Sequence, residues 1–173
     1  MSFKLPLVLL LLGAVLAIPF LLRPSAPKGA VPEGETERLV ILTPHNETIK
    51  TEWEQAFRKH YRKKYGRDIV LDYRAPGGTS DIMRYIADRY QTEFRRYCET
   101  RHLPWNDRIA GAFSRDPAPD APEEVKTARR AFLDSDVSIG VDLMAGGGVF
   151  ELARNAAAGF AVDAGIREKY PEL

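Results

Sequence analysis

The sequence predicts an α/β protein built on a parallel sheet with the order βαβαβ. Short apolar runs at 39–42, at 69–71 and from Val137 into the glycines at 146–148 have the composition of strands, the first of them covered on both faces. Segments with helical periodicity separate these runs, and each run is followed by a loop rich in polar residues or glycine. Because strands that alternate with helices are joined by right-handed crossovers, we expect the three strands to lie parallel.

Composition narrows the classes of function. The 173 residues are 45% hydrophobic and 28% charged, which is typical of a globular domain. The net charge of +1 arises from interspersed acids and bases, so no nucleic-acid partner is expected. The basic run at 58–64 shares a helix with an apolar face and is interpreted as a solvated surface. Cys98 is the only cysteine, which excludes an intrachain disulfide and a cysteine-based metal or redox motif.

Residues 1–23 form the first distinct segment of the chain. Lys4 and Arg23 flank an apolar run over 5–22. A run of about 18 residues lies between the core of a signal peptide and a minimal membrane span. We expect an export signal, either cleaved after Ala17 or retained as an N-terminal hydrophobic helix that anchors the chain. Both alternatives place the rest of the protein in the periplasm or on the extracytoplasmic face of the membrane.

A linker and the first strand–helix pair follow. Residues 24–37 are rich in proline and glycine, so the folded part should begin near Arg38. Residues 48–65 carry apolar side chains mostly three or four positions apart, which predicts an amphipathic helix, and Gly66 supplies its end. We expect the apolar stripe of this helix, with its histidine, to pack in the core. The stripe consists of Ile49, Trp53, Ala56, Phe57, His60, Tyr61 and Tyr65.

The second strand–helix pair leads into a longer irregular segment. A strand at 68–74 precedes a helix that is expected over 80–90. Residues 91–121 are polar, aromatic and then rich in proline, and we interpret them as an excursion from the sheet that is partly helical at its start. Trp105 lies in this excursion just after a proline and is expected to be exposed.

The chain is organised around its last strand–helix pair. A helix over 122–132 leads into a short apolar strand that starts at Val137 and runs into three consecutive glycines, and a helix over 150–158 follows. A strand that ends in glycines before a helix brings backbone N–H groups to the carboxyl edge of the sheet. The N-terminus of that helix favours a polar or anionic ligand.

Three loops are therefore predicted to form one ligand-binding rim at the carboxyl edge of the sheet. Each loop also has a structural explanation: capping of a helix for the first, a tight turn for the second, and close helix–strand packing for the third. The second loop lacks the spacing and the lysine of a phosphate-binding motif. The candidate ligand-binding residues are His45, Asn46, Glu47, Thr48, Gly77, Gly78, Thr79, Ser80, Gly146, Gly147 and Gly148.

An enzymatic alternative uses some of the same residues. His45 and Glu47 imitate a metal-binding pair, and His45, Ser80 and Asp81 imitate a hydrolase triad. No His-Glu-x-x-His, Cys-x-x-Cys or Gly-x-Ser-x-Gly motif accompanies them. A triad also requires hydrogen-bond contact between nucleophile and base, which sequence spacing does not establish. We therefore expect no enzyme activity, no metal site and no cofactor.

Three groups of residues, taken in order, carry a resemblance to a known family. The first two are Leu39-Val40-Ile41-Leu42-Thr43 with its polar loop, and Tyr73-Arg74 with Gly77-Gly78-Thr79-Ser80. The third is Asp136-Val137-Ser138-Ile139-Gly140, followed by Gly146-Gly147-Gly148. Over about 38–173, apart from the excursion, the chain resembles the N-terminal lobe of type II periplasmic solute-binding proteins of ABC transporters. The likeness is to the extracellular solute-binding family 1 and its iron(III)-type branch.

The resemblance implies a transport function. Such proteins bind a small polar solute reversibly between two lobes and deliver it to an ABC permease in the inner membrane. Because the chain is too short for two lobes, we expect it to be a fragment that contains the first lobe. The solute is left open among iron, a polyamine, a phosphonate, a sugar and an organic anion. The alternative is a membrane-anchored protein-interaction domain on the same fold, which would use the proline-rich excursion with Trp105.

Overall fold

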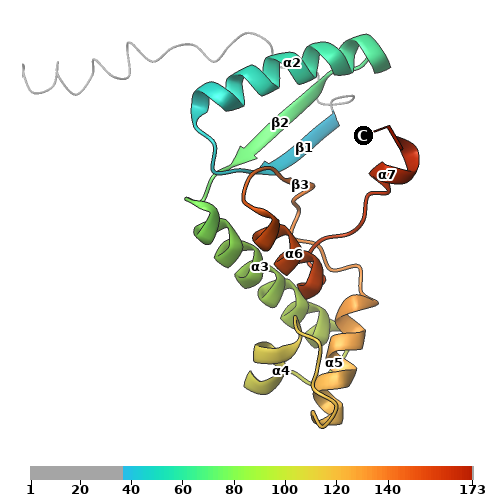
Figure 1. Ribbon diagram of the computed structural model, residues 1–173. Coiled ribbons are helices and arrows are strands. Elements are labelled where there is room, and N and C mark those ends of the chain that lie inside the picture. Colours follow the sequence, from blue (N-terminus) through green and yellow to red (C-terminus); the bar gives the residue numbers. More distant parts are fainter. Residues whose placement is uncertain (1–36, 173) are drawn as a thin grey trace, which may run out of the picture. The chain divides into compact units, whose positions relative to one another are not determined.

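The computed structural model describes residues 37–172 and contains one small parallel sheet (Figure 1). Its strands are β1 (Glu37–Leu42), β2 (Ile69–Arg74) and β3 (Leu143–Met144), in the order β2-β1-β3. The predicted α/β class with three parallel strands is confirmed. The expected signal or anchor at 1–23 lies outside the described residues, as does the linker except Glu37, which already belongs to β1. None of the helices formed by residues 37–172 combines the length and the apolar character needed to cross a membrane.

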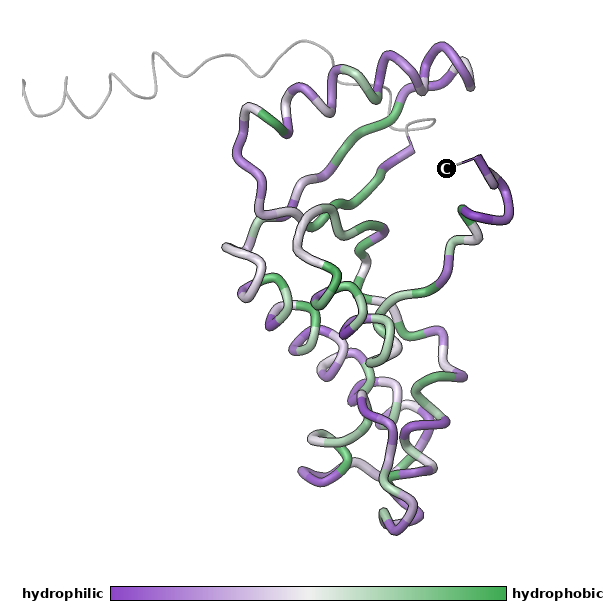
Figure 2. Tube along the Cα trace, in the orientation of Figure 1, coloured by the Kyte–Doolittle hydropathy of each residue, from purple (hydrophilic) through white to green (hydrophobic). Residues whose placement is uncertain are grey.

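The middle strand, β1, holds the sheet together. It pairs with β2 in register over all six residues, beginning with Glu37 opposite Ile69. Its pairing with β3 involves only Ile41 and Leu42. Because neighbouring strand residues face opposite sides of a sheet, these two lie in different core clusters. Figure 2 shows the strands mostly in green, the colour of hydrophobic residues, beside a helix that is largely purple.

The third strand is shorter than predicted. A strand was predicted from Val137 into the glycines at 146–148, and within this stretch the structure forms β3 only at Leu143–Met144. Gly140 has a φ of 65°, which interrupts an extended chain. The carboxylate Oδ2 of Asp142 accepts the backbone N–H of Val40 at 2.7 Å, where a backbone carbonyl would extend the ladder. The backbone hydrogen bonds to β1 therefore begin at Asp142, whose N–H donates to the Val40 carbonyl at 3.0 Å.

The first helix, α2 (Glu47–Tyr65), has the ends expected from the sequence. The side chain of Asn46 caps its start by accepting the Ile49 N–H at 3.1 Å, and Gly66 ends it with a backbone bond to the Arg62 carbonyl. The helix contacts β2. The predicted helix over 48–65 is thus confirmed.

The apolar stripe of α2 is only partly covered, which corrects the prediction that it is core. Trp53 and Phe57 are 40% and 36% exposed, and His60 is exposed as well. One aromatic of the stripe, Tyr61, does pack against buried strand residues. These residues are Ile41, Ile69 and Leu71. Helix α2 therefore leaves part of its apolar face, and part of the sheet, open.

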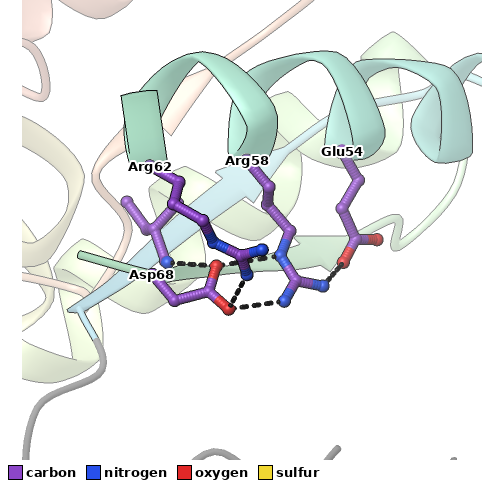
Figure 3. A network of polar contacts seen from close by, with 5 residues as sticks. Glu54, Arg58, Arg62 and Asp68 are labelled. Carbon is purple, nitrogen blue, oxygen red and sulfur yellow. Dashed lines mark hydrogen bonds and ion pairs between the residues drawn. The ribbon is translucent and has the colours of Figure 1, made fainter. Parts of the chain in front are cut away.

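Ion pairs fasten α2 to the start of β2 (Figure 3). Arg58 and Arg62 donate hydrogen bonds to Oδ2 of Asp68 at 2.9 and 2.7 Å, and Arg58 also contacts Glu54 at 3.5 Å. The hydrogen bond from Arg58, with a further one from Arg62, holds the pKa of the Asp68 carboxyl well below its usual range. Two residues of the basic run that was predicted to be a solvated face, Arg58 and Arg62, are therefore bound in ion pairs with Asp68.

The excursion is more ordered than predicted. Helix α3 (Thr79–Thr100) continues past its predicted end at residue 90, and a short helix, α4 (Asp107–Ala112), follows within the excursion. The predicted third helix is confirmed as α5 (Glu123–Leu133). These three helices enclose a cluster of buried residues: Phe94, Cys98, Ile109, Phe113, Ala128 and Phe132.

Trp105 belongs to this cluster, which corrects the prediction that it is exposed. Its ring lies 5.8 Å from that of Phe94 and 6.1 Å from that of Phe113, measured between centroids, and it is partly buried. The aromatic residues of the excursion thus build a second core. The chain closes with α6 (Val149–Ala158), close to its predicted bounds, and the unpredicted turn of helix α7 (Ile166–Lys169).

Candidate functional site

The three predicted loops meet at the carboxyl edge of the sheet. A Cβ atom built on Gly146 would lie 2.9 Å from Cδ of Pro44 and 3.1 Å from Cε1 of His45, so the third loop touches the first. A Cβ atom on Gly147 would lie 3.3 Å from Cγ2 of Thr79, so the third loop also touches the start of α3. The structure therefore brings together residues from all three loops.

The first loop holds its histidine in a fixed position. Nδ1 of His45 lies 2.7 Å from the hydroxyl of Thr43, which also accepts the His45 backbone N–H at 3.3 Å. The His45 ring lies 4.8 Å from that of Trp53, tilted by 56°. Because Nδ1 is engaged, Nε2 is the ring nitrogen without a hydrogen-bond partner among residues 37–172. It is the atom of this loop best placed to contact a ligand.

The other candidates of the first loop have structural tasks. Asn46 caps α2, as the structural explanation of this loop expects. Glu47 forms an ion pair with Lys50, one turn further along the helix, while its own side chain stays 88% exposed. Thr48 is exposed at the start of α2. Glu47 and Thr48 are therefore accessible, whereas the Asn46 side chain is committed to the helix.

In the second and third loops, carboxylates from the first turns of α3 and α6 accept hydrogen bonds from backbone N–H groups. Asp81 accepts the Gly78 N–H at 3.1 Å, and Glu151 accepts the Gly148 N–H at 2.9 Å. Each pair forms one half of a capping box, in which a side chain in the first turn bonds back to the residue before the helix; the glycine at that position has no side chain to form the other half. Two of the amides expected to meet a ligand therefore already have an anionic partner.

The third loop needs its glycines for backbone reasons. Gly146 and Gly147 have φ angles of 114° and 88°, in a region that residues with a Cβ rarely adopt. The close approach of Gly146 to Pro44 leaves no room for a side chain. Close packing, one of the two explanations considered from the sequence, thus accounts for at least these two glycines, and ligand contact there stays a prediction.

The geometry gives no support to a hydrolase triad. His45 bonds to Thr43 and Asp81 bonds to Gly78, and no hydrogen bond joins His45 to Ser80 or to Asp81. Within residues 37–172 there is also no group of three or more histidine, cysteine or acidic side chains that could hold a metal ion.

Sequence reasoning missed two residues of this edge. Thr43, fully buried at the end of β1, fixes the histidine ring. Lys50, 8% exposed, is the only buried residue of α2. Its spacing of three from Glu47 is a sequence signal for an ion pair, and the position of Thr43 directly after the strand marks it as part of the edge.

Comparisons of the chain with protein-family models, with curated proteins and with solved structures found no match.

Proposed function

We propose that the chain forms the first lobe of an extracytoplasmic solute-binding component of an ABC import system. It would bind a small polar solute reversibly at the carboxyl edge of the sheet and deliver it to a permease in the inner membrane. The observation that carries the proposal is the contact of Gly146 with Pro44 and His45, which joins two sequence-distant loops into one rim. In open α/β sheets, the crevice outside the carboxyl ends of the strands is the usual place for a ligand.

The charges at this edge favour a neutral or cationic solute. Each of the three helices places one carboxylate in its first turn there: Glu47, Asp81 and Glu151. Asp81 and Glu151 already compensate the positive end of their helices. An anionic solute would have to displace them or lie beside them. Among the solutes left open by the sequence, a polyamine or a sugar therefore fits better than a phosphonate or an organic anion.

A thermal-shift screen of the protein encoded by the complete native reading frame tests the proposal. Spermidine, iron(III), maltose, methylphosphonate and citrate are the probes. A bound solute at about 100 times its Kd stabilises the folded state by about 2.7 kcal/mol, which raises Tm by several degrees. We expect spermidine or maltose to produce this shift, and the shift to be lost in His45→Ala but kept in His60→Ala.

His60 is a suitable control because it is an exposed histidine of α2 outside the loops. A screen in which no probe raises Tm would contradict the proposal, as would a native reading frame that encodes no second lobe. If the increase in Tm is unchanged in His45→Ala, the solute binds at a place other than this edge.

A second candidate function is a protein-interaction domain, favoured by an apolar groove of about 390 Å³ between α2 and the sheet. Its lining is apolar apart from one tyrosine: Leu39, Ile41, Trp53, Ala56, Phe57, Leu71, Tyr73, Leu143 and Ala145. Such a groove fits the apolar face of an amphipathic helix from a partner protein. The test is the Trp53 fluorescence of the chain during titration with a Leu/Lys amphipathic helical peptide. A saturable blue shift that Phe57→Glu abolishes supports this function, and its absence contradicts it.

A further inference from the structure

A larger cavity lies among α3, the segment that follows α4, and α6. Its volume is about 720 Å³, within the usual range for sites that bind small molecules. Of the predicted ligand-binding residues, only Ser80 lines it. The other lining residues come from further along α3, from 110–116, from α6 and from Phe160. The cavity borders the rim formed by the three loops at Ser80 and Glu151, but most of its lining comes from other segments.

One buried arginine fixes a wall of this cavity. Arg129 of α5 is 5% exposed and donates hydrogen bonds to the backbone carbonyls of Phe113, Ala157 and Ala158, at 3.3, 2.9 and 2.7 Å. It also donates to the carboxylate of Asp116 at 3.2 Å. All four of these partners line the cavity. Because a single rigid guanidinium holds them, this wall is preorganised.

The cavity presents an excess of positive charge. Three arginines, Arg84, Arg115 and Arg154, line it, against two carboxylates, Asp116 and Glu151. Both carboxylates have partners within the protein: Asp116 accepts from Arg129, and Glu151 accepts the Gly148 N–H.

The three arginines, in contrast, have few or no ion-pair partners within the described residues. Neither Arg115 nor Arg154 has an ion-pair partner among residues 37–172, and Arg84 has only a 3.5 Å contact with Asp81. Arg115 and Arg154 are both exposed. A guanidinium presents paired N–H donors that match a carboxylate or a phosphate. The guanidinium N–H groups of Arg115 and Arg154 are therefore available to donate hydrogen bonds to an anionic ligand.

Part of the remaining lining is apolar and aromatic, beside the polar residues Ser80, Gln91 and Ser114. Phe113 and Phe160 line it, with ring centroids 6.4 Å apart, and Phe160 is held by stacking on Tyr90 at 4.5 Å. Phe150, another lining residue, is 72% exposed. Aromatic side chains offer large contact areas and specific ring geometry to an apolar or aromatic ligand.

We propose that this cavity binds a small aromatic anion, with the ring against Phe150 and Phe160 and the carboxylate or phosphate on Arg115 and Arg154. Arg129 is a positioning residue: it does not line the cavity, and its hydrogen bonds hold four lining residues in place. This binding does not depend on the proposed transport function. A solute at the three loops is expected to be neutral or cationic, so the two sites differ in ligand charge and in the residues that recognise it.

Isothermal titration of the full chain with phenyl phosphate tests the proposal, with benzyl alcohol and inorganic phosphate as matched probes. We expect saturable binding of phenyl phosphate. Each of the other two probes should bind at least about tenfold more weakly, because benzyl alcohol lacks the anionic group and inorganic phosphate lacks the aromatic ring. Arg115→Gln and Arg154→Gln should each weaken phenyl phosphate binding by about tenfold. Both residues are exposed, so these substitutions should leave Tm almost unchanged.

Arg95→Gln is the matched control. Arg95 is an exposed arginine of α3 that pairs with Glu99 and does not line the cavity, so its replacement should leave the affinity unchanged. His45→Ala should also bind phenyl phosphate normally, which separates this site from the loops. Absence of saturable binding, or equal affinity in the Arg115→Gln/Arg154→Gln double variant, would overturn the proposal. Inorganic phosphate binding as tightly as phenyl phosphate would overturn the aromatic part of it.

Discussion

Gly146 lies against Pro44 so closely that a Cβ atom on the glycine would stand 2.9 Å from Cδ of the proline ring. The two residues are about 100 positions apart in the chain and follow β3 and β1, which are neighbours in the sheet. Proline Cδ belongs to a rigid ring and cannot rotate away. This contact therefore fixes the third loop onto the first and limits what residue 146 can be.

Gly146→Ala should destabilise the protein by about 1–3 kcal/mol, because alanine adds strain at a φ of 114° to a clash with Pro44. Urea unfolding of the full chain measures the change. Gly111→Ala is the matched control: a Cβ there meets nothing within 4 Å, and the residue lies in α4. This control should be neutral or stabilising by up to about 1 kcal/mol, because alanine is the better helix former. Equal effects of the two substitutions would contradict the role of the Gly146 contact.

Arg129→Met should destabilise the protein by about 3 kcal/mol or more. It leaves the carbonyls of Phe113, Ala157 and Ala158 without their donor and removes the tie between α5 and the C-terminal end of α6. Arg130→Met is the control in the same helix, since Arg130 is exposed and makes only two long contacts, a 3.9 Å ion pair with Glu123 and a 3.4 Å hydrogen bond to the Lys126 carbonyl. Its cost should stay within about 0.5 kcal/mol in the same unfolding experiment. Similar losses for both variants would show that Arg129 is not the connecting residue.

Local patterns predicted the elements that depend on nearby residues. The helix at 48–65 was placed correctly because its periodicity, the cap at Asn46 and the stop at Gly66 are all local signals. The β1 and β2 strands were also placed correctly. The third strand was predicted between Val137 and the glycines at 146–148; it does form in this stretch, but only at Leu143–Met144, after the buried Ile139.

Features that depend on long-range contacts were not predictable in the same way. Only the fold shows that the Asp142 carboxylate takes the Val40 N–H and displaces β3 along the chain. Periodicity also cannot tell which apolar stripe is covered, so Trp53 was expected in the core and Trp105 on the surface, the reverse of what is found. The meeting of the three loops followed from the rule for parallel strands. The cavity around Arg115 and Arg154 joins segments about 40 positions apart and has no sequence motif.

Cys98 should be unreactive in the folded protein. It is 1% exposed within the aromatic cluster of α3, α4 and α5, and burial raises the pKa of its thiol. Labelling with 5,5′-dithiobis(2-nitrobenzoate) should therefore wait for local or global opening and become fast in urea. Thr51→Cys, at an exposed position of α2, provides an internal control that should react at once with one equivalent. Fast reaction of two equivalents in the folded variant would contradict the burial of Cys98.

Asp68 should make stability depend on acid pH. Its hydrogen bond from Arg58 lowers the folded pKa below the unfolded value of about 3.9. The unfolded state therefore binds the proton first as pH falls, so the stabilisation by Asp68 is complete above about pH 5 and is lost progressively toward pH 1. We expect the free energy of unfolding of the native chain to exceed that of Asp68→Asn by a constant amount above about pH 5, and the difference to shrink at lower pH.

Urea unfolding at a series of pH values measures this difference, with Asp120→Asn as the control. Asp120 is exposed and has no ion-pair or hydrogen-bond partner for its side chain among residues 37–172. Its replacement should leave the curve of stability against pH parallel to that of the native chain. A gap between the native chain and Asp68→Asn that stays constant down to about pH 2 would show that the Asp68 carboxylate contributes through its shape and neutral hydrogen bonds. In that case the charge of the network in Figure 3 would not be what fastens α2 to β2.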